Sequence, residues 1–192
     1  MAIKTFAVGE VLTASDTNTY LANSGLVHIA TVSWSAATQV DFLNVFSSTY
    51  TNYRVVFDNW TATVSENHLF RVRDSGGILT GASYITQRLE QTSTTVSGVL
   101  VGGGASSAWF PTYIGTGAGA EGVAGVMDIY QPNVAGYTRT TGQFSRWDAA
   151  AGYSVQFSGL YNATTVLTGF SLVRNSTATM TGKASVYGYR IS

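Results

Sequence analysis

The sequence predicts an all-β protein: an antiparallel two-sheet jelly-roll-like sandwich, preceded by an N-terminal arm with one short helix. From Gly25 onward, apolar and polar residues alternate with the period of two that half-buried strands require. No helical crossover separates these runs, so the sheets should be mainly antiparallel. The chain has 192 residues, close to the size of one domain with a sizeable core.

The arm comes first, and its pattern differs from the rest of the chain. Thr13 and Asp16 have the spacing of a capping box, with Asp in place of the preferred Glu or Gln, and Gly25 supplies a left-handed stop after Asn23. These signals predict a helix from about Ala14 to Ala22. Residues 1–25 are therefore assigned to the arm and residues 26–192 to the β-domain.

The predicted helix and the residues that lead into it have few large apolar side chains to bury, and these are the expected attachment residues: Val11, Leu12, Tyr20 and Leu21. Isolated helices shorter than about 12 residues are marginal in water, so such a helix needs a surface that completes it. That surface is either the sandwich of the same chain, which the helix would plug, or another protein. Attachment to another protein is the favoured alternative.

Eight later segments are strand-sized and rich in β-branched or aromatic residues. They are 26–34, 53–60, 69–74, 83–89, 123–131, 153–161, 167–174 and 183–191, with weaker candidates at 96–101, 108–114 and 137–145. Only Pro111 and Pro132 interrupt this part of the chain. The connections are too long and uneven for an up-and-down barrel, which favours a jelly roll.

The charge balance excludes several classes of partner. Ten Lys and Arg residues balance ten Asp and Glu residues, which gives no basic surface for nucleic acid or anionic lipid. Only 10% of the residues are charged, against about 25% in an ordinary domain, which is typical of a surface covered by neighbours. We therefore expect a homo-oligomer, most simply a trimer. No apolar run has the length of a signal peptide or of a membrane span.

Neither catalysis nor metal binding is indicated. The chain has no cysteine and only two histidines, His28 and His68, which share no metal-ligand spacing. The acidic residues that could serve a glycosidase are scattered singly: Asp58, Glu66, Asp74 and Asp128. The sequence therefore predicts no catalytic residue, no cofactor and no metal.

Three tryptophans are candidates for contact with a partner. Trp60, Trp109 and Trp147 lie at strand ends or in loops, where an aromatic face can stack on a sugar ring or fill a subunit interface. The alternative for each is burial in the core.

The segment "FAVGEVLTASDTNTYLANSGLV" (residues 6–27) resembles the N-terminal segment of many small virion proteins of tailed bacteriophages. "VSWSAATQVDFLNVFSSTYTNYRVVFDNW" (32–60), "LFRVRDSGG…TGASY" (69–84), "GVMDIYQP" (125–132) and "TATMTGKASVYGYRIS" (177–192) resemble the same group. In that group the last strand of a jelly roll ends in a Tyr-Gly pair, here Tyr187 and Gly188. Residues 90–122 match least.

The resemblance implies a non-enzymatic structural protein of the virion, assembled in the cytoplasm of the bacterial host. Its arm would hold it to other virion proteins, of the tail or the major capsid shell, and its β-domain would face outward. No coiled-coil or triple-helical shaft follows the arm. This argues against a long fibre and leaves a short tail appendage, which is slightly favoured, or a capsid decoration or cement protein as the alternative. A module that binds host glycans is a second alternative.

Overall fold

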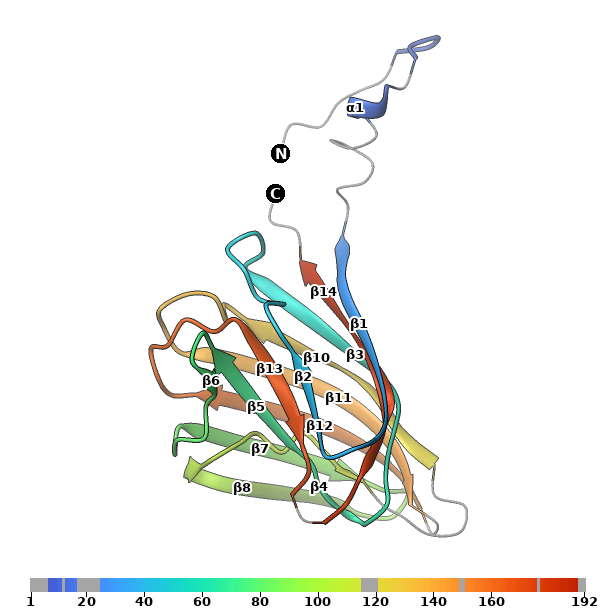
Figure 1. Ribbon diagram of the computed structural model, residues 1–192. Helices are drawn as coiled ribbons and strands as arrows, with labels where there is room; N and C mark the ends of the chain where they lie inside the picture. The colour runs from blue at the N-terminus through green and yellow to red at the C-terminus, as the bar shows by residue number, and fades with distance from the viewer. Residues whose placement is uncertain are drawn as a thin grey trace.

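The computed structural model describes residues 7–11, 13–16, 25–114, 121–148, 151–175 and 177–189. It confirms the fold class: strands dominate, their pairs are antiparallel, and the sheets form a sandwich-like arrangement (Figure 1). The only helical residues described are Ala14–Asp16 (α1). The remainder of the helix expected up to Ala22 lies outside the described residues.

Two sheets make up the sandwich, and a short two-stranded sheet lies beside them. The large sheet has the order β1 (Leu26–Ala37), β14 (Met180–Tyr189), β3 (Asn52–Ala62), β10 (Glu121–Tyr130), β11 (Thr138–Asp148), β12 (Ala151–Tyr161), β7 (Tyr84–Gln91) and β8 (Val96–Ser106). The small sheet has the order β2 (Gln39–Phe42), β13 (Gly169–Val173), β5 (Leu69–Asp74) and β6 (Gly77–Ile78). The third sheet pairs β4 (Glu66–Asn67) with β9 (Tyr113–Ile114).

The pairing is nested, as in a long antiparallel ribbon that has been rolled up. The first strand pairs with the last, β1 with β14; then β2 pairs with β13, β3 with β10, and β5 with β6. Successive pairs fall alternately in the large and the small sheet. This interleaving is the jelly-roll arrangement that the sequence predicts.

Four further strands extend the large sheet beyond the jelly roll. β11, β12, β7 and β8 continue it outward from β10, so one sheet is twice as wide as the other. The segment around Trp109 covers part of the inner face of this extension. Trp109 forms two backbone hydrogen bonds with Phe70 of β5, each of 2.9 Å, and its ring meets Tyr84 of β7 edge to face.

Stacked aromatic rings occupy the space between the sheets. The Phe170 ring is parallel to the Phe42 and Phe70 rings on the neighbouring strands, with centroids at 4.3 and 4.5 Å. All three side chains are fully or almost fully buried, and Phe46 packs against Phe170 at 5.9 Å. The alternation of apolar residues in β5 and β13 places these rings on the inner face.

The Tyr-Gly pair at the end of β14 has a clear structural role. Tyr187 points outward and meets the His28 ring of β1 edge to face at 5.5 Å. Gly188 points inward beneath Tyr50, whose ring carbons would lie 2.4 to 2.6 Å from a Cβ at this position. Only glycine leaves room for the Tyr50 ring here.

All eight well-patterned segments form strands, namely β1, β3, β5, β7, β10, β12, β13 and β14. Of the weaker candidates, 96–101 and 137–145 correspond to β8 and β11, whereas 108–114 contains only β9 and the single bridge at Trp109. The sequence pattern does not predict the three short strands β2, β4 and β6. These strands have four, two and two residues, too few to establish a period.

Substituting Phe170 by Ala tests the aromatic stack. The cavity left between Phe42 and Phe70 should lower the free energy of unfolding by about 3 to 5 kcal/mol, measured by urea denaturation. Val166→Ala, at a side chain that is 44% exposed, is the matched control and should change stability by no more than about 0.5 kcal/mol. Equal, small effects of the two substitutions would contradict the assignment of Phe170 to the core.

Candidate functional site

The arm residues 7–11 and 13–15 are all exposed. Residues 7–11 and 13–16 form no part of the sandwich core, and the apolar side chains Val8 and Val11 are 109% and 79% exposed. A turn at Ala7 to Glu10 is closed by a backbone hydrogen bond of 3.1 Å, with Gly9 in the left-handed region at a φ of 86°. Of the four expected attachment residues, Val11 is thus exposed, whereas Leu12, Tyr20 and Leu21 lie outside the described residues.

The expectation that Trp60 and Trp109 contact a partner or glycan is wrong: both side chains are fully buried in the core. Trp60 faces inward because β3 carries a bulge at Asp58 and Asn59, where the pairing with β14 and β10 shifts and Asn59 has a φ of 49°. The extra residue turns Trp60 to the same side as Phe57, on which it stacks at 5.3 Å. Trp109 is drawn inward by its pairing with Phe70.

Trp147 is the one of the three that reaches the surface, and its side chain is 46% exposed. It lies on the outer face of β11, directly opposite Gly152 of β12. A Cβ at Gly152 would lie only 3.2 and 3.3 Å from two carbons of the indole ring. The glycine therefore allows the ring to lie against the partner strand. A role of Trp147 in recognition stays a prediction.

Trp147 belongs to a ladder of outward side chains on the β11–β12 hairpin, which we call the hairpin face. The ladder consists of the directly opposed pairs Arg139 and Leu160, Thr141 and Ser158, Gln143 and Gln156, Ser145 and Ser154, and Trp147 and Gly152. The alternate residues of both strands point into the sandwich, among them Phe144, Val155 and Phe157. Strand alternation thus separates an apolar inner face from a polar outer face.

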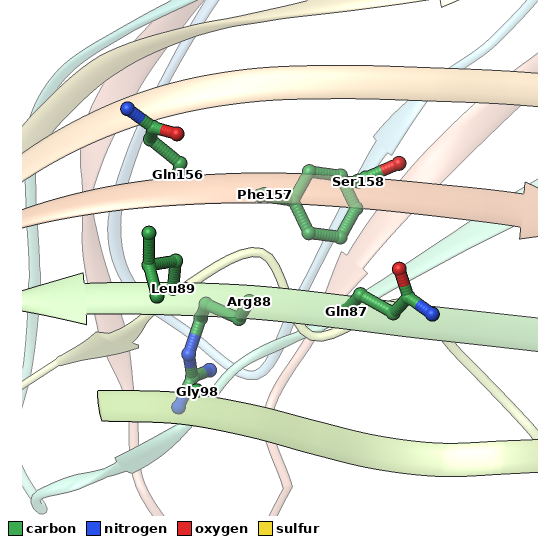
Figure 2. Close-up of a pocket in the computed structure, with 7 residues that line it drawn as sticks. All are labelled: Gln87, Arg88, Leu89, Gly98, Gln156, Phe157 and Ser158. Atoms are coloured by element: carbon green, nitrogen blue, oxygen red, sulfur yellow. The ribbon is translucent and has the colours of Figure 1, made fainter. Parts of the chain in front are cut away.

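Four shallow depressions lie along the hairpin face. Two flank Gln156, with volumes of about 470 and 400 Å³, and share it in their walls. A third, of about 370 Å³, lies beside Thr141 and Ser158, and the fourth, of about 440 Å³, beside Trp147. Figure 2 shows the largest: Gln156 and Ser158 of β12 and Gln87 of β7 stand around it, and Gly98 of β8 forms its far side.

A charged pair lies beside the hairpin face on the same outer surface. Arg54 of β3 donates two hydrogen bonds to the Asp128 carboxylate, of 2.8 and 2.7 Å, and Tyr189 donates a third of 2.7 Å. Burial opposes ionisation of Asp128, but these hydrogen bonds and the Arg54 charge outweigh it and lower the pKa of the carboxyl group. Burial and the Asp128 carboxylate raise the pKa of Tyr189 to about 12.

A buried charge cluster supports the hairpin from the inner side. Glu90 lies 2.7 Å from Arg88 and 3.1 Å from Arg146, and all three side chains are 14% exposed or less. The Arg146 guanidinium also lies over the Tyr153 ring, 3.7 Å from its centroid. Burial lowers the pKa of Arg88, and repulsion from Arg146 adds to this, whereas Glu90 opposes both. Arg146 neighbours Trp147, so the cluster fixes the strand that presents the tryptophan.

The two histidines lie in different places. His28 accepts or donates a hydrogen bond of 2.8 Å with Thr31 on the outer surface of β1. His68 is 1% exposed and packs edge to face on Trp60, with its Nε2 3.9 Å from Glu66. Burial lowers the pKa of His68, and the Glu66 carboxylate only partly offsets this.

The scattered carboxylates each have their own partner. Asp58 pairs with Lys183, and Asp128 binds Arg54. Asp74 accepts hydrogen bonds from the backbone of Gly76 and Gly77 in a turn. Glu66 accepts one from the backbone of Asn175.

Across the described ranges, no group of three or more His, Asp or Glu residues is placed to hold a metal ion. Nor does any helix in the described part of the chain have the length and apolar character needed to cross a membrane.

Comparisons with known proteins give no match: no family model, no curated protein and no solved structure is significantly similar to this chain.

The buried charge cluster gives a prediction about stability. Glu90→Gln leaves Arg88 and Arg146 together without their counter-charge, which should cost about 3 to 5 kcal/mol of unfolding free energy in urea denaturation. Asp58→Asn is the control, because the Asp58–Lys183 pair is 59% and 48% exposed and should contribute little. If the two variants were equally stable, Glu90 would not be a structural counter-ion.

The burial of neutral His68 gives a prediction about pH. Because its pKa is lowered by folding, the unfolded chain binds the extra proton, and stability is full above about pH 6.5 and is lost as the pH falls below it. One such proton lowers the unfolding free energy by at most about 1.4 kcal/mol per pH unit. Urea denaturation between pH 5 and pH 8 should show this slope, and His68→Gln should flatten it. An unchanged slope in the variant would assign the acid sensitivity to other groups.

Proposed function

We propose that this chain is a non-enzymatic structural protein of a tailed-bacteriophage particle, anchored by its N-terminal arm and displaying the sandwich at the particle surface. One observation carries the proposal: arm residues 7–11 and 13–15, including the apolar Val8 and Val11, are exposed and take no part in the core. Exposed apolar side chains in a segment that leaves the domain are suited to burial on another protein. The resemblance of residues 6–27 to arms of phage virion proteins supports the same function.

The position of the arm on the sandwich supports attachment. Leu26 at the start of β1 pairs with Tyr189 near the end of β14, so the chain enters and leaves the sandwich at one corner. In Figure 1, α1 is drawn beyond this corner, away from the sheets. Among the described residues, the first to pack on the core is Ile29. A sandwich core that forms without the described residues of the arm leaves these residues available to a neighbouring protein.

The partner we propose is another virion protein, and the protein itself acts as a homotrimer. A short tail appendage is slightly favoured over a capsid decoration, and the absence of a coiled-coil or triple-helical repeat between the arm and the jelly roll argues against a long fibre. The low content of charged residues, 10%, suits close packing with copies of the chain and with other virion proteins.

Charging the arm tests this function. Val8→Asp together with Val11→Asp should abolish burial of both side chains on a partner, at a cost of about 1 to 3 kcal/mol each, and three arms multiply that loss through avidity. The protein carried by purified virions, measured by quantitative mass spectrometry, should fall strongly, while the Tm of the isolated protein barely moves. Val134→Asp together with Val166→Asp is the matched control, since both valines are exposed on the sandwich.

The opposite pattern would contradict attachment by the arm. If the arm variant lowers the Tm sharply while virions still carry the protein, the arm belongs to its own sandwich. The pair Tyr20→Ala and Leu21→Ala applies the same test to the remainder of the arm.

A further inference from the structure

We propose that the hairpin face binds a neutral, linear oligosaccharide along the β11–β12 hairpin, with Trp147 as the platform on which one sugar ring stacks. The inference goes beyond attachment by the arm and does not depend on it. It rests on three features of the described residues: the chemistry of the ladder, the presentation of Trp147, and the depressions between the side chains.

The chemistry of the ladder matches sugar hydroxyl groups. Its central pairs are hydroxyl with hydroxyl and amide with amide: Thr141 with Ser158, Gln143 with Gln156, and Ser145 with Ser154. Each amide offers two N–H donors and an acceptor oxygen, and each hydroxyl offers one O–H donor and an acceptor oxygen, as the vicinal hydroxyls of a pyranose require. From Arg139 to Trp147 the ladder runs for about 27 Å at the rise of a strand, enough for several sugars in a row.

Charge on this surface is largely compensated. Asp128 and Arg54, which line one depression, neutralise each other through two hydrogen bonds. Arg88 and Arg146, which line two others, share the Glu90 carboxylate. Arg139, at the end of the ladder farthest from Trp147, is the one charged side chain among its ten members. A surface of this kind favours a neutral ligand over a polyanion, which needs several uncompensated cations.

Trp147 is presented as a flat platform. The indole lies against Gly152 on one side, and with 46% of its surface exposed it leaves the rest for a ligand. The strand beneath is fixed by the next residue, Arg146, which is paired with Glu90 and stacked on Tyr153. A rigid aromatic side chain loses little entropy on binding, which suits it to stacking on a sugar ring.

The shape of the surface favours an oligosaccharide over a second copy of the chain. Protein interfaces bury well-packed apolar and aromatic cores, whereas the hairpin face is polar and hollowed by depressions of about 370 to 470 Å³. A flat sheet placed against it would leave these spaces unfilled and the amides without partners. Sugar rings with their hydroxyls fill such spaces and satisfy the amides.

Tryptophan fluorescence tests the proposal directly, because the other three tryptophans are 8% exposed or less. The probes are linear neutral oligosaccharides of glucose, galactose and mannose, added to the full-length protein. A ligand on Trp147 should shift the emission to shorter wavelength and protect it from acrylamide quenching. Gln143→Ala with Gln156→Ala should weaken the affinity by about tenfold, whereas Gln91→Ala, outside the depressions, should not.

Calorimetry covers the variant that removes the fluorescent reporter. Trp147→Ala should weaken binding by about tenfold or more, and Tyr137→Ala, at an exposed aromatic residue outside the ladder, should bind as the parent does. Two results would overturn the proposal. One is that none of the probes protects Trp147 in the folded protein. The other is that Trp147 becomes protected on raising the protein concentration alone, which would make the hairpin face an interface between copies.

Discussion

The pairing of β1 with β14 is the constraint on which the rest of the structure depends. It joins the beginning and end of the sandwich through a register that runs from Leu26 and Tyr189 to Ala37 and Met180. Between these two strands in the sequence, β2 pairs with β13, and β3 pairs with β10, so the later pairs are nested inside the first. The register fixes which residues face the core, since a slip of one residue would turn Trp34, Val186 and their neighbours outward. Such distant pairings are slow to form.

The same constraint determines where the fold can be enlarged. β1 is one edge strand of the large sheet, and the added strands β11, β12, β7 and β8 continue the sheet from β10 to the other edge. The added strands need cover on their inner face, and the segment around Trp109 provides part of it through its pairing with Phe70. Their outer face is left polar. The hairpin face is thus a product of the extension, whereas the arm emerges at the opposite edge of the large sheet, at β1.

Much of the fold could be predicted from the sequence because strand alternation is a strong local signal. The exceptions have physical reasons. The bulge at Asn59 turns Trp60 inward, and neither its positive φ nor the shift in pairing leaves a mark in a pattern of period two. Trp109 follows a Gly-rich segment and is buried by one distant bridge, which only the tertiary structure reveals. The ladder on β11 and β12 was also missed, although its alternating Thr, Gln, Ser and Trp residues are visible in "TTGQFSRW", because the partner strand and register are long-range information.

A density map of intact virions is the most direct test of the central claim, that the arm binds another virion protein while the sandwich faces outward. The account predicts that the arm lies in a groove of a tail or capsid protein, that the corner formed by β1 and β14 faces the particle, and that Trp147 faces solvent. An arm packed beneath its own sandwich, or a hairpin face covered by a neighbouring subunit, would contradict it.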